Sequence, residues 1–238
     1  MNIALLTAAG TGTRMHQDIP KQFIHVDNKP VIIHTLEAFQ KHPSIDAIIV
    51  VTLDSWSEVV WAYAKQFNIT KLKWVVPGGD SGQESIRNGL DTLANAGIDE
   101  EIVVMIHDGN RPLVTTEIIS DSLATFKKYG SAVAVIPCTE VVFESEDGFS
   151  SCVSTEREKL FRTQTPHTYK LKDLIWAHEE AKKQGIAGTA ASCMLMKELG
   201  KMTYFSKGSE INFKITTLED LNLFKALLST KLDDWIKG

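Results

Sequence analysis

Short apolar runs alternate with longer amphipathic stretches along the first 136 residues of the chain. The short runs are mostly continuous in hydrophobicity, which is typical of strands buried on both faces. They are Ile3–Leu6, Ala47–Thr52, Lys73–Val76, Ile102–Ile106 and Ala132–Ile136. Between them, apolar residues recur three and four positions apart and predict helices at Val31–Lys41, Trp56–Phe67, Gln83–Ala94 and Thr116–Tyr129. This alternation predicts an α/β fold with a mostly parallel central sheet, in which ligands bind at the carboxyl ends of the strands.

The pattern changes after Pro137. Residues Thr139–Phe161 contain β-branched and aromatic residues around a polar turn and have no helical period. They predict a β-arm, about residues 139–161, that projects from the sheet. Three further helices and a short strand are expected at Leu171–Gln184, Ala190–Leu199, Leu218–Ser229 and Met202–Phe205. Without a repeat or linker, the sequence predicts a single domain over residues 1–238.

Composition and charge exclude several classes of protein to which the chain could belong. The hydrophobic fraction of 43% allows a sizeable core, and the formal charge of −5 argues against a nucleic-acid partner or an anionic membrane surface. No apolar run approaches the ~18–20 residues of a membrane span. The three cysteines have no CxxC or metal-ligand spacing. We therefore expect a cytoplasmic protein that holds any anionic ligand through a local cluster of donors.

The loop after the first strand is the first candidate site. Its small residues, Ala8 to Gly12, allow backbone N–H groups to approach a phosphate, and Arg14 and Lys21 could neutralise a triphosphate. The alternative is a glycine turn that only reverses the chain. A Walker loop is excluded because GxxxxGK[ST] is absent, and a dinucleotide fingerprint because its third glycine position is Met15.

Two more polar segments follow predicted strands. Gly79 and Asp80 close the third strand, with Ser85 on the next helix, although Gly-Gly-Asp is also an ordinary turn sequence. Asp108 ends the fourth strand and is a candidate ligand for Mg²⁺, which prefers carboxylates plus phosphate oxygens. The alternative is that Asp108 caps the following helix and pairs with Arg111. His107 is expected to be structural and not a proton carrier.

The runs AAGTGTRM, PKQF and HDGNRP resemble the signatures of the 2-C-methyl-erythritol 4-phosphate cytidylyltransferases and the related ribitol-5-phosphate cytidylyltransferases. The resemblance implies a Rossmann-like nucleotidyltransferase domain that transfers CMP from CTP to a polyol phosphate and releases pyrophosphate, with Mg²⁺. It implies catalytic roles for Arg14, Lys21 and Lys214, the last in NFKIT, which is similar to NIKVT of the family. The implied nucleotide-binding residues are Ala8, Ala9, Gly10, Thr11, Gly12, Gly79, Asp80 and Ser85.

The same resemblance implies an acceptor site shared between two subunits. Arg157 matches an arginine that the family contributes from the partner subunit, so a homodimer is expected. The implied acceptor-binding residues are Arg111, Thr139, Arg157 and Thr165.

Departures from the family pattern leave alternatives open. The usual arginine after Gly-Asp falls at Gly82, the arm threonine aligns with Val141, and an acidic residue aligns with Ala191. The acceptor could be methylerythritol phosphate, for isoprenoid precursors, or ribitol phosphate, for envelope polymers such as teichoic acid or capsule. A non-catalytic paralogue that only binds nucleotide is the third alternative, and the intact cationic set argues against it.

Overall fold

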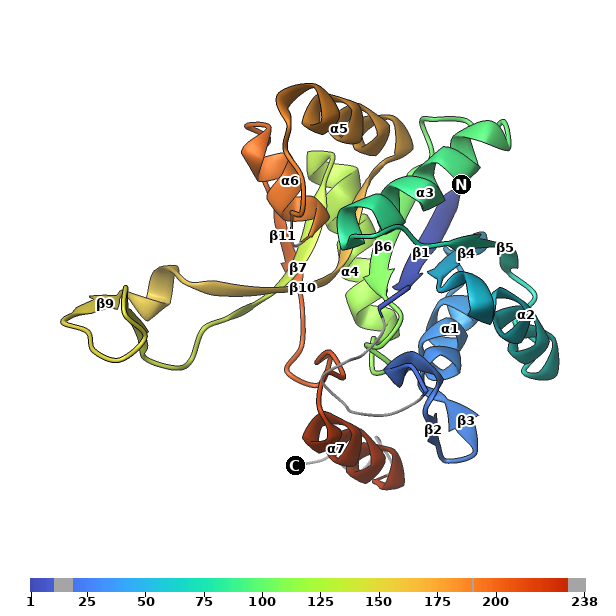
Figure 1. Cartoon of the computed structure of the whole chain (residues 1–238), viewed down its shortest axis with the longest axis horizontal. Helices are drawn as coiled ribbons and strands as arrows, with labels where there is room; N and C mark the ends of the chain where they lie inside the picture. The colour runs from blue at the N-terminus through green and yellow to red at the C-terminus, as the bar shows by residue number, and fades with distance from the viewer. Residues whose placement is uncertain (11–18, 190, 231–238) are drawn as a thin grey trace.

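The computed structural model describes residues 1–10, 19–189 and 191–230. Its centre is a seven-stranded sheet in the order β11-β7-β10-β6-β1-β4-β5 (Figure 1). All neighbouring strands are parallel except β10, which runs antiparallel to both β6 and β7. The strands are β1 (Asn2–Ala8), β4 (Ala47–Thr52), β5 (Leu72–Pro77), β6 (Val103–Asp108), β7 (Ala132–Pro137), β10 (Phe161–Lys170) and β11 (Phe205–Lys207). The α/β class and the mostly parallel sheet are confirmed.

Alternate residues of the central strands face two helical layers. Leu5 and Val51 pack toward α3 (Gly82–Asn95), α5 (Leu171–Gln184) and α6 (Ser192–Glu198). Leu6 and Val50 pack toward α1 (Val31–Lys41), α2 (Ser57–Gln66) and α4 (Thr116–Tyr129). This alternation explains why the strands are continuously apolar, since each face has its own core.

A smaller hydrophobic cluster packs helix α7 (Leu218–Ser229) beside α1. Phe224 of α7 is fully buried with Val31 and Ile215. A short hairpin, β2 (His25–Val26) and β3 (Lys29–Pro30), adds Val26 to this cluster. The chain also contains two 3₁₀ turns, η2 (Lys21–Phe23) and η3 (Asp54–Trp56), which contact each other. The ring of Phe23 stacks on Trp56 with centroids 4.2 Å apart.

The helix boundaries follow from local capping. Ser81 accepts from the Glu84 amide at the start of α3, and Thr115 caps α4. Thr217 and Asp220 form a capping box at α7. The predicted bounds of α1, α4, α5, α7 and β4 are those of the structure. The predicted strand near Met202–Phe205 lies instead at β11, and α6 begins at Ser192, two residues later than expected.

The strand β10 is a central element of the sheet that the sequence did not predict. Its residues 164–169 are buried, yet they include Gln164, Thr165, Pro166 and His167, which do not read as a strand core. The side chains of Gln164, Thr165 and Thr168 have partners from other elements, such as the 2.7 Å hydrogen bond between Thr168 and Ser122. Only these distant partners make the segment suitable for the interior.

The predicted arm projects away from the sheet (Figure 1). It consists of the antiparallel pair β8 (Val142–Glu144) and β9 (Val153–Thr155), followed by the 3₁₀ turn η4 (Arg157–Lys159). Its tip is held by Asp147, whose carboxylate accepts from the Phe149 and Ser150 amides. Apolar side chains of the arm are exposed, with Phe143 at 62% and Phe149 at 95%.

Candidate active site

A cavity of about 730 Å³ lies at the carboxyl ends of the central strands. The sheet continues from one side of β1 through β4 and β5, and from the other side through β6. The boundary between β1 and β6 is therefore the topological switch point, where α/β sheets place their ligands. The predicted site residues that line the cavity are Ala8, Ala9, Gly10, Lys21, Gly79, Asp80, Ser85, Asp108, Arg111, Thr165 and Lys214.

The glycine loop is described only up to Gly10. Thr11, Gly12 and Arg14, which were predicted as nucleotide-binding or catalytic residues, lie outside the described residues. Ala8, Ala9 and Gly10 line the cavity, and Lys21 reaches it from the turn η2. The described part of the loop and Lys21 therefore line the same cavity.

The Gly-Gly-Asp turn packs tightly against the loop. The Gly78 amide donates to the Thr52 carbonyl at 2.7 Å, and a Cβ at Gly78 would lie 2.3 Å from the Ala9 Cβ. The Gly79 amide donates to the Ser85 hydroxyl at 3.1 Å. Close approach therefore requires glycine at position 78. Gly82 is different, because a Cβ there would meet no described atom within 4 Å.

Asp108 is the centre of a charged cluster. One carboxylate oxygen lies 2.9 Å from Lys214 Nζ and the other lies 2.8 Å from Arg111 Nε. Arg111 Nη1 also donates to the Asn212 carbonyl at 2.8 Å. Burial opposes the charge of the carboxylate, but Lys214 and Arg111 hold the pKa of Asp108 well below its usual range. Asp108 is therefore an anion between two cations.

The alternative interpretation of Asp108 is half correct. Arg111 does pair with it, as that interpretation expected. Asp108 does not cap the next helix, because α4 is capped by Thr115. The pair leaves Asp108 and Lys214 on the cavity wall, where both can meet a ligand.

Behind Asp108 lies a neutral histidine. His107 is fully buried, and loss of hydration lowers its pKa to about 3. Its Nε2 lies 3.2 Å from the Arg111 carbonyl, which can only accept, so Nε2 carries the proton. Its Nδ1 then accepts from the Thr165 hydroxyl at 2.9 Å. This geometry fits the expected structural role of His107.

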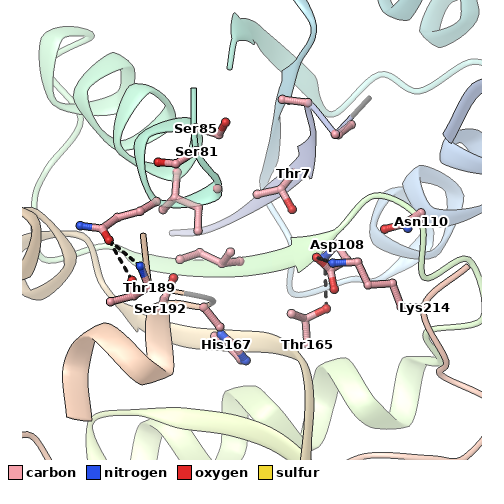
Figure 2. Close-up of a pocket in the computed structure, with 18 of the residues that line it drawn as sticks. Thr7, Ser81, Ser85, Asp108, Asn110, Thr165, His167, Thr189, Ser192 and Lys214 are labelled. Atoms are coloured by element: carbon pink, nitrogen blue, oxygen red, sulfur yellow. Dashed lines mark hydrogen bonds and ion pairs between the residues drawn. The ribbon is translucent and has the colours of Figure 1, made fainter. Parts of the chain in front are cut away.

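The same chain of bonds limits what Thr165 can do. Its hydroxyl oxygen accepts from the Asp108 amide at 3.1 Å, while its proton is used by His107. One lone pair stays available on the oxygen. Thr165 can therefore accept a hydrogen bond from a ligand hydroxyl without breaking its own contacts. Figure 2 shows Thr165 directly below Asp108, with Lys214 beside them.

Thr139 and Arg157 are not brought to this cavity by their own chain. Both lie on the arm, where Arg157 Nη1 is 3.5 Å from the Thr139 carbonyl and Nε is 3.1 Å from a Glu158 oxygen. Neither is among the residues that line the cavity.

The far end of the cavity contains polar residues that sequence reasoning missed. Gln83 accepts from the Thr189 amide and hydroxyl, each at 3.0 Å, and joins α3 to the segment before α6. Figure 2 shows Thr189 and Ser192 at this end, opposite Asp108 and Lys214. The buried Ser192 hydroxyl and His178 Nε2 have no hydrogen-bond partner among the described residues. Nothing in the local sequence marks Gln83 and Thr189, because their contact joins segments 106 positions apart.

The sheet order, the glycine loop at the switch point and the cationic cluster around Asp108 define an α/β protein with a site suited to an anionic ligand. A sequence profile of the IspD family, 2-C-methyl-D-erythritol 4-phosphate cytidylyltransferase, matches residues 2–230. The chain belongs to this family of enzymes, so the resemblance seen in the motifs and the enzyme class are confirmed.

Individual relatives carry two different names. A ribitol-5-phosphate cytidylyltransferase from Lacticaseibacillus paracasei is 42% identical over 97% of this chain and 99% of its own length. A 2-C-methyl-D-erythritol 4-phosphate cytidylyltransferase from Clostridium botulinum is 39% identical over 95% of this chain and 97% of its own. The crystal structure of the latter enzyme from Thermus thermophilus superposes with a TM-score of 0.77 at 25% identity, covering 97% of this chain and 100% of that one.

Among the described residues, no helix is both long and apolar enough to span a bilayer.

Proposed function

We propose that this enzyme transfers CMP from CTP to D-ribitol 5-phosphate and releases pyrophosphate. The observation that carries the proposal is the Asp108, Arg111 and Lys214 cluster, which lines one cavity together with the described part of the glycine loop and Lys21. The higher identity to the Lacticaseibacillus paracasei relative supports ribitol phosphate over methylerythritol phosphate as the acceptor. Use of the product in envelope polymers and a cytoplasmic location stay predictions.

The reaction needs charge neutralisation more than proton transfer. An acceptor phosphate oxygen attacks the α-phosphorus of CTP in line, and the bond from that phosphorus to the oxygen of the leaving pyrophosphate breaks. The nucleophile is already an anion, so a general base is not required. Lys21 and Lys214, with Arg14 of the glycine loop, are the groups we assign to the developing charge on the phosphates. Arg111 is assigned to the acceptor substrate. The hydroxyl oxygen of Thr165 would accept a hydrogen bond from a hydroxyl group of that substrate.

We also propose that Asp108 holds Mg²⁺ together with the nucleotide. Among the described residues no group of three His, Cys, Asp or Glu side chains could hold a metal alone. Mg²⁺ is commonly bound by one or two carboxylates plus substrate phosphates, so a single ionised carboxylate on the cavity wall fits. The bound ion would neutralise phosphate charge.

The nucleotide's base would contact the Gly79 to Ser85 turn. Ser85 is buried, and its hydroxyl accepts from the Gly79 amide, so the turn presents fixed backbone groups to a planar ligand. Fixed donors and acceptors select cytosine over uracil, because the wrong base leaves a buried group unpaired. Gly79, Asp80 and Ser85 are therefore our assignment for base and ribose contacts.

The acceptor site would be completed by a second subunit. The arm presents apolar side chains to solvent, and a two-stranded hairpin of this kind is marginal without a partner surface. A two-fold axis would pair each arm with its own copy. We propose that such a homodimer brings Thr139 and Arg157 of one chain to the Asp108 cluster of the other.

The test is pyrophosphate release from CTP with each polyol phosphate. We expect release with ribitol 5-phosphate at the higher kcat/KM, slower release with 2-C-methyl-D-erythritol 4-phosphate, and little with UTP in place of CTP. A reversed acceptor preference would move the protein to the isoprenoid branch. Tight CTP binding without release for either acceptor would instead support the non-catalytic paralogue.

A further inference from the structure

Gln22 joins the turn that carries Lys21 to the glycine loop. Its side-chain amide nitrogen donates to the Ala8 carbonyl at 2.5 Å and to the Gly10 carbonyl at 3.1 Å. The side chain is 2% exposed, so these bonds are shielded from water. Both N–H bonds of the amide are thus used on two carbonyl groups of the same loop.

The other side of the turn is also fixed. Phe23 is 2% exposed and stacks on Trp56, and its amide donates to the Pro20 carbonyl at 2.8 Å. The backbone of η2 is therefore anchored on both sides of Lys21. Within the described residues, Gln22 makes two direct hydrogen bonds from this turn to the loop, so its side chain helps to set the distance between Lys21 and the loop.

The choice of carbonyl groups has an electrostatic consequence. A phosphate is attracted by N–H groups and repelled by carbonyl oxygens, since the oxygen is the negative end of the peptide dipole. Ala8, Ala9, Gly10 and Lys21 all line the same cavity. By turning the Ala8 and Gly10 oxygens toward itself, Gln22 keeps them from facing an anionic ligand. A preorganised loop also avoids the cost of ordering when the ligand binds.

We propose that Gln22 is a positioning residue for the nucleotide triphosphate, acting through the glycine loop and Lys21. The proposal rests on the proposed function, because it assigns the triphosphate to this loop. Gln22 also lines the cavity, but its amide N–H groups are used on the two loop carbonyls and not on a ligand. It would set the direction of two carbonyl groups and the distance between a loop and a cation.

The first variant is Gln22→Met, which keeps the length of the side chain and removes both donors. Gln40→Met is the matched control, because Gln40 also makes two hydrogen bonds, to the Thr70 hydroxyl and from the Lys71 amide, each 2.9 Å, in a surface region that does not line the cavity. Both variants lose two hydrogen bonds, and only one of them loosens the loop. Thermal unfolding gives the structural cost of each change.

We expect the CTP dissociation constant of Gln22→Met, measured by calorimetry, to rise roughly tenfold, with a lower kcat and an unchanged KM for the acceptor. Gln40→Met should match the wild type in all three quantities at a temperature below both unfolding transitions. Equal CTP affinity in the two variants would overturn the proposal. The binding measurement is independent of turnover, so a wild type that binds CTP without releasing pyrophosphate refutes the proposed function and still tests Gln22.

The second variant, Gln22→Glu, tests the proposal through the pH dependence of CTP affinity. Its carboxylate would face two carbonyl oxygens, so at about pH 8 its CTP affinity should fall below that of Gln22→Met. Between about pH 8 and pH 6 protonation supplies one O–H donor, and the ratio of its dissociation constant to that of the wild type should shrink. A ratio that stays constant with pH, in a folded variant, would contradict a role for the donated hydrogen bonds.

Discussion

Arg111 in the cavity and Arg157 on the arm carry the same charge but are held in different ways. The Arg111 side chain is 12% exposed and is fixed by Asp108 and the Asn212 carbonyl. The Arg157 side chain is 54% exposed, and its ion pair is with its sequence neighbour Glu158. An exposed pair between neighbours contributes little to stability and does not fix a direction. The chain alone positions Arg111, whereas Arg157 needs another surface to gain a defined position.

This difference separates two kinds of preorganisation. The Asp108 cluster is built on β6 and on segments that the sheet holds in place, so it exists in a single chain. The arm has its own backbone pairing but few buried contacts. The effect of a cavity mutation on activity should therefore not depend on protein concentration. A mutation in the arm should instead act by changing the association of two chains.

The largest effect is expected for Asp108→Asn, which keeps the shape of the side chain and removes the charge between Lys214 and Arg111. Activity with CTP should fall about 10³-fold, because both cations lose their fixed position and the proposed Mg²⁺ ligand is lost. Steady-state kinetics across Mg²⁺ concentrations and circular dichroism check this. A folded variant with wild-type activity would show that the cluster has only a structural role.

The next test combines a subunit mutated in the cavity with a subunit mutated in the arm. Lys21→Ala should lower kcat about 10²-fold with a smaller change in CTP affinity, and Arg157→Ala should lower activity roughly 10- to 100-fold. In a heterodimer of the two, one site has both residues intact, so about half of the wild-type activity should return. Activity is measured on heterodimers purified through two different tags.

Two results would count against the shared site in that experiment. One is a verified heterodimer that is no more active than its parents. The other is full activity of Arg157→Ala alone, which would make Arg157 an ordinary solvated charge.

A moderate effect is expected for Phe143→Ser on the arm. The side chain is 62% exposed in the single chain and would be covered in the proposed dimer, so the dimer dissociation constant should rise about tenfold. Trp61→Ser is the control, because Trp61 is also exposed, at 39%, but lies on α2. Sedimentation equilibrium measures both. A monomeric wild type would remove the proposed dimer and leave the cavity chemistry unchanged.

The smallest effect concerns acid stability of the cavity region. Burial lowers the pKa of His107 to about 3, from about 6.5 in an unfolded chain. Between these values the unfolded state binds a proton that the folded state does not, so the free energy of unfolding falls as the pH falls below about 6.5. His107→Asn keeps an acceptor for Thr165 and should reduce this slope.

The slope is measured as the change in melting temperature between about pH 6.5 and pH 4.5. This window lies above the pH range in which protonation of Asp108 changes the stability. The buried His167 and His178, whose pKa values burial lowers to about 4, keep part of the slope in the variant. A slope identical in His107→Asn and the wild type would contradict the assignment of a neutral buried imidazole.

Periodicity and motif spacing predicted much of this molecule because the features concerned are local. The bounds of α1 and α4 follow from the helical period, and the position of Asp108 at the end of a strand follows from the apolar run before it. Hydrophobic pattern could not reveal β10, because Thr165 and Thr168 are buried through hydrogen bonds to His107 and Ser122. The contact of Gln83 with Thr189 joins positions 106 residues apart and leaves no local signal.

Some predictions are not tested by these observations. The roles of Thr11, Gly12 and Arg14 stay predictions, since these residues lie outside the described part of the chain. The assignment of residues 1–238 to one domain also stays a prediction. The resemblance supplied the roles of Thr139 and Arg157, which no physical property of a single chain would assign.

The path of β10 determines where the sequence can change in length. The strand begins beside the arm at Phe161 and reaches Thr165 four residues later, and successive side chains of a strand point to opposite faces. One residue inserted between them would turn Thr165 away from His107 and Asp108 and displace the arm at the same time. The turn around Asp147 at the tip of the arm has no such constraint. Insertions and deletions should therefore accumulate in that turn during evolution, while the spacing from η4 to Thr165 stays constant.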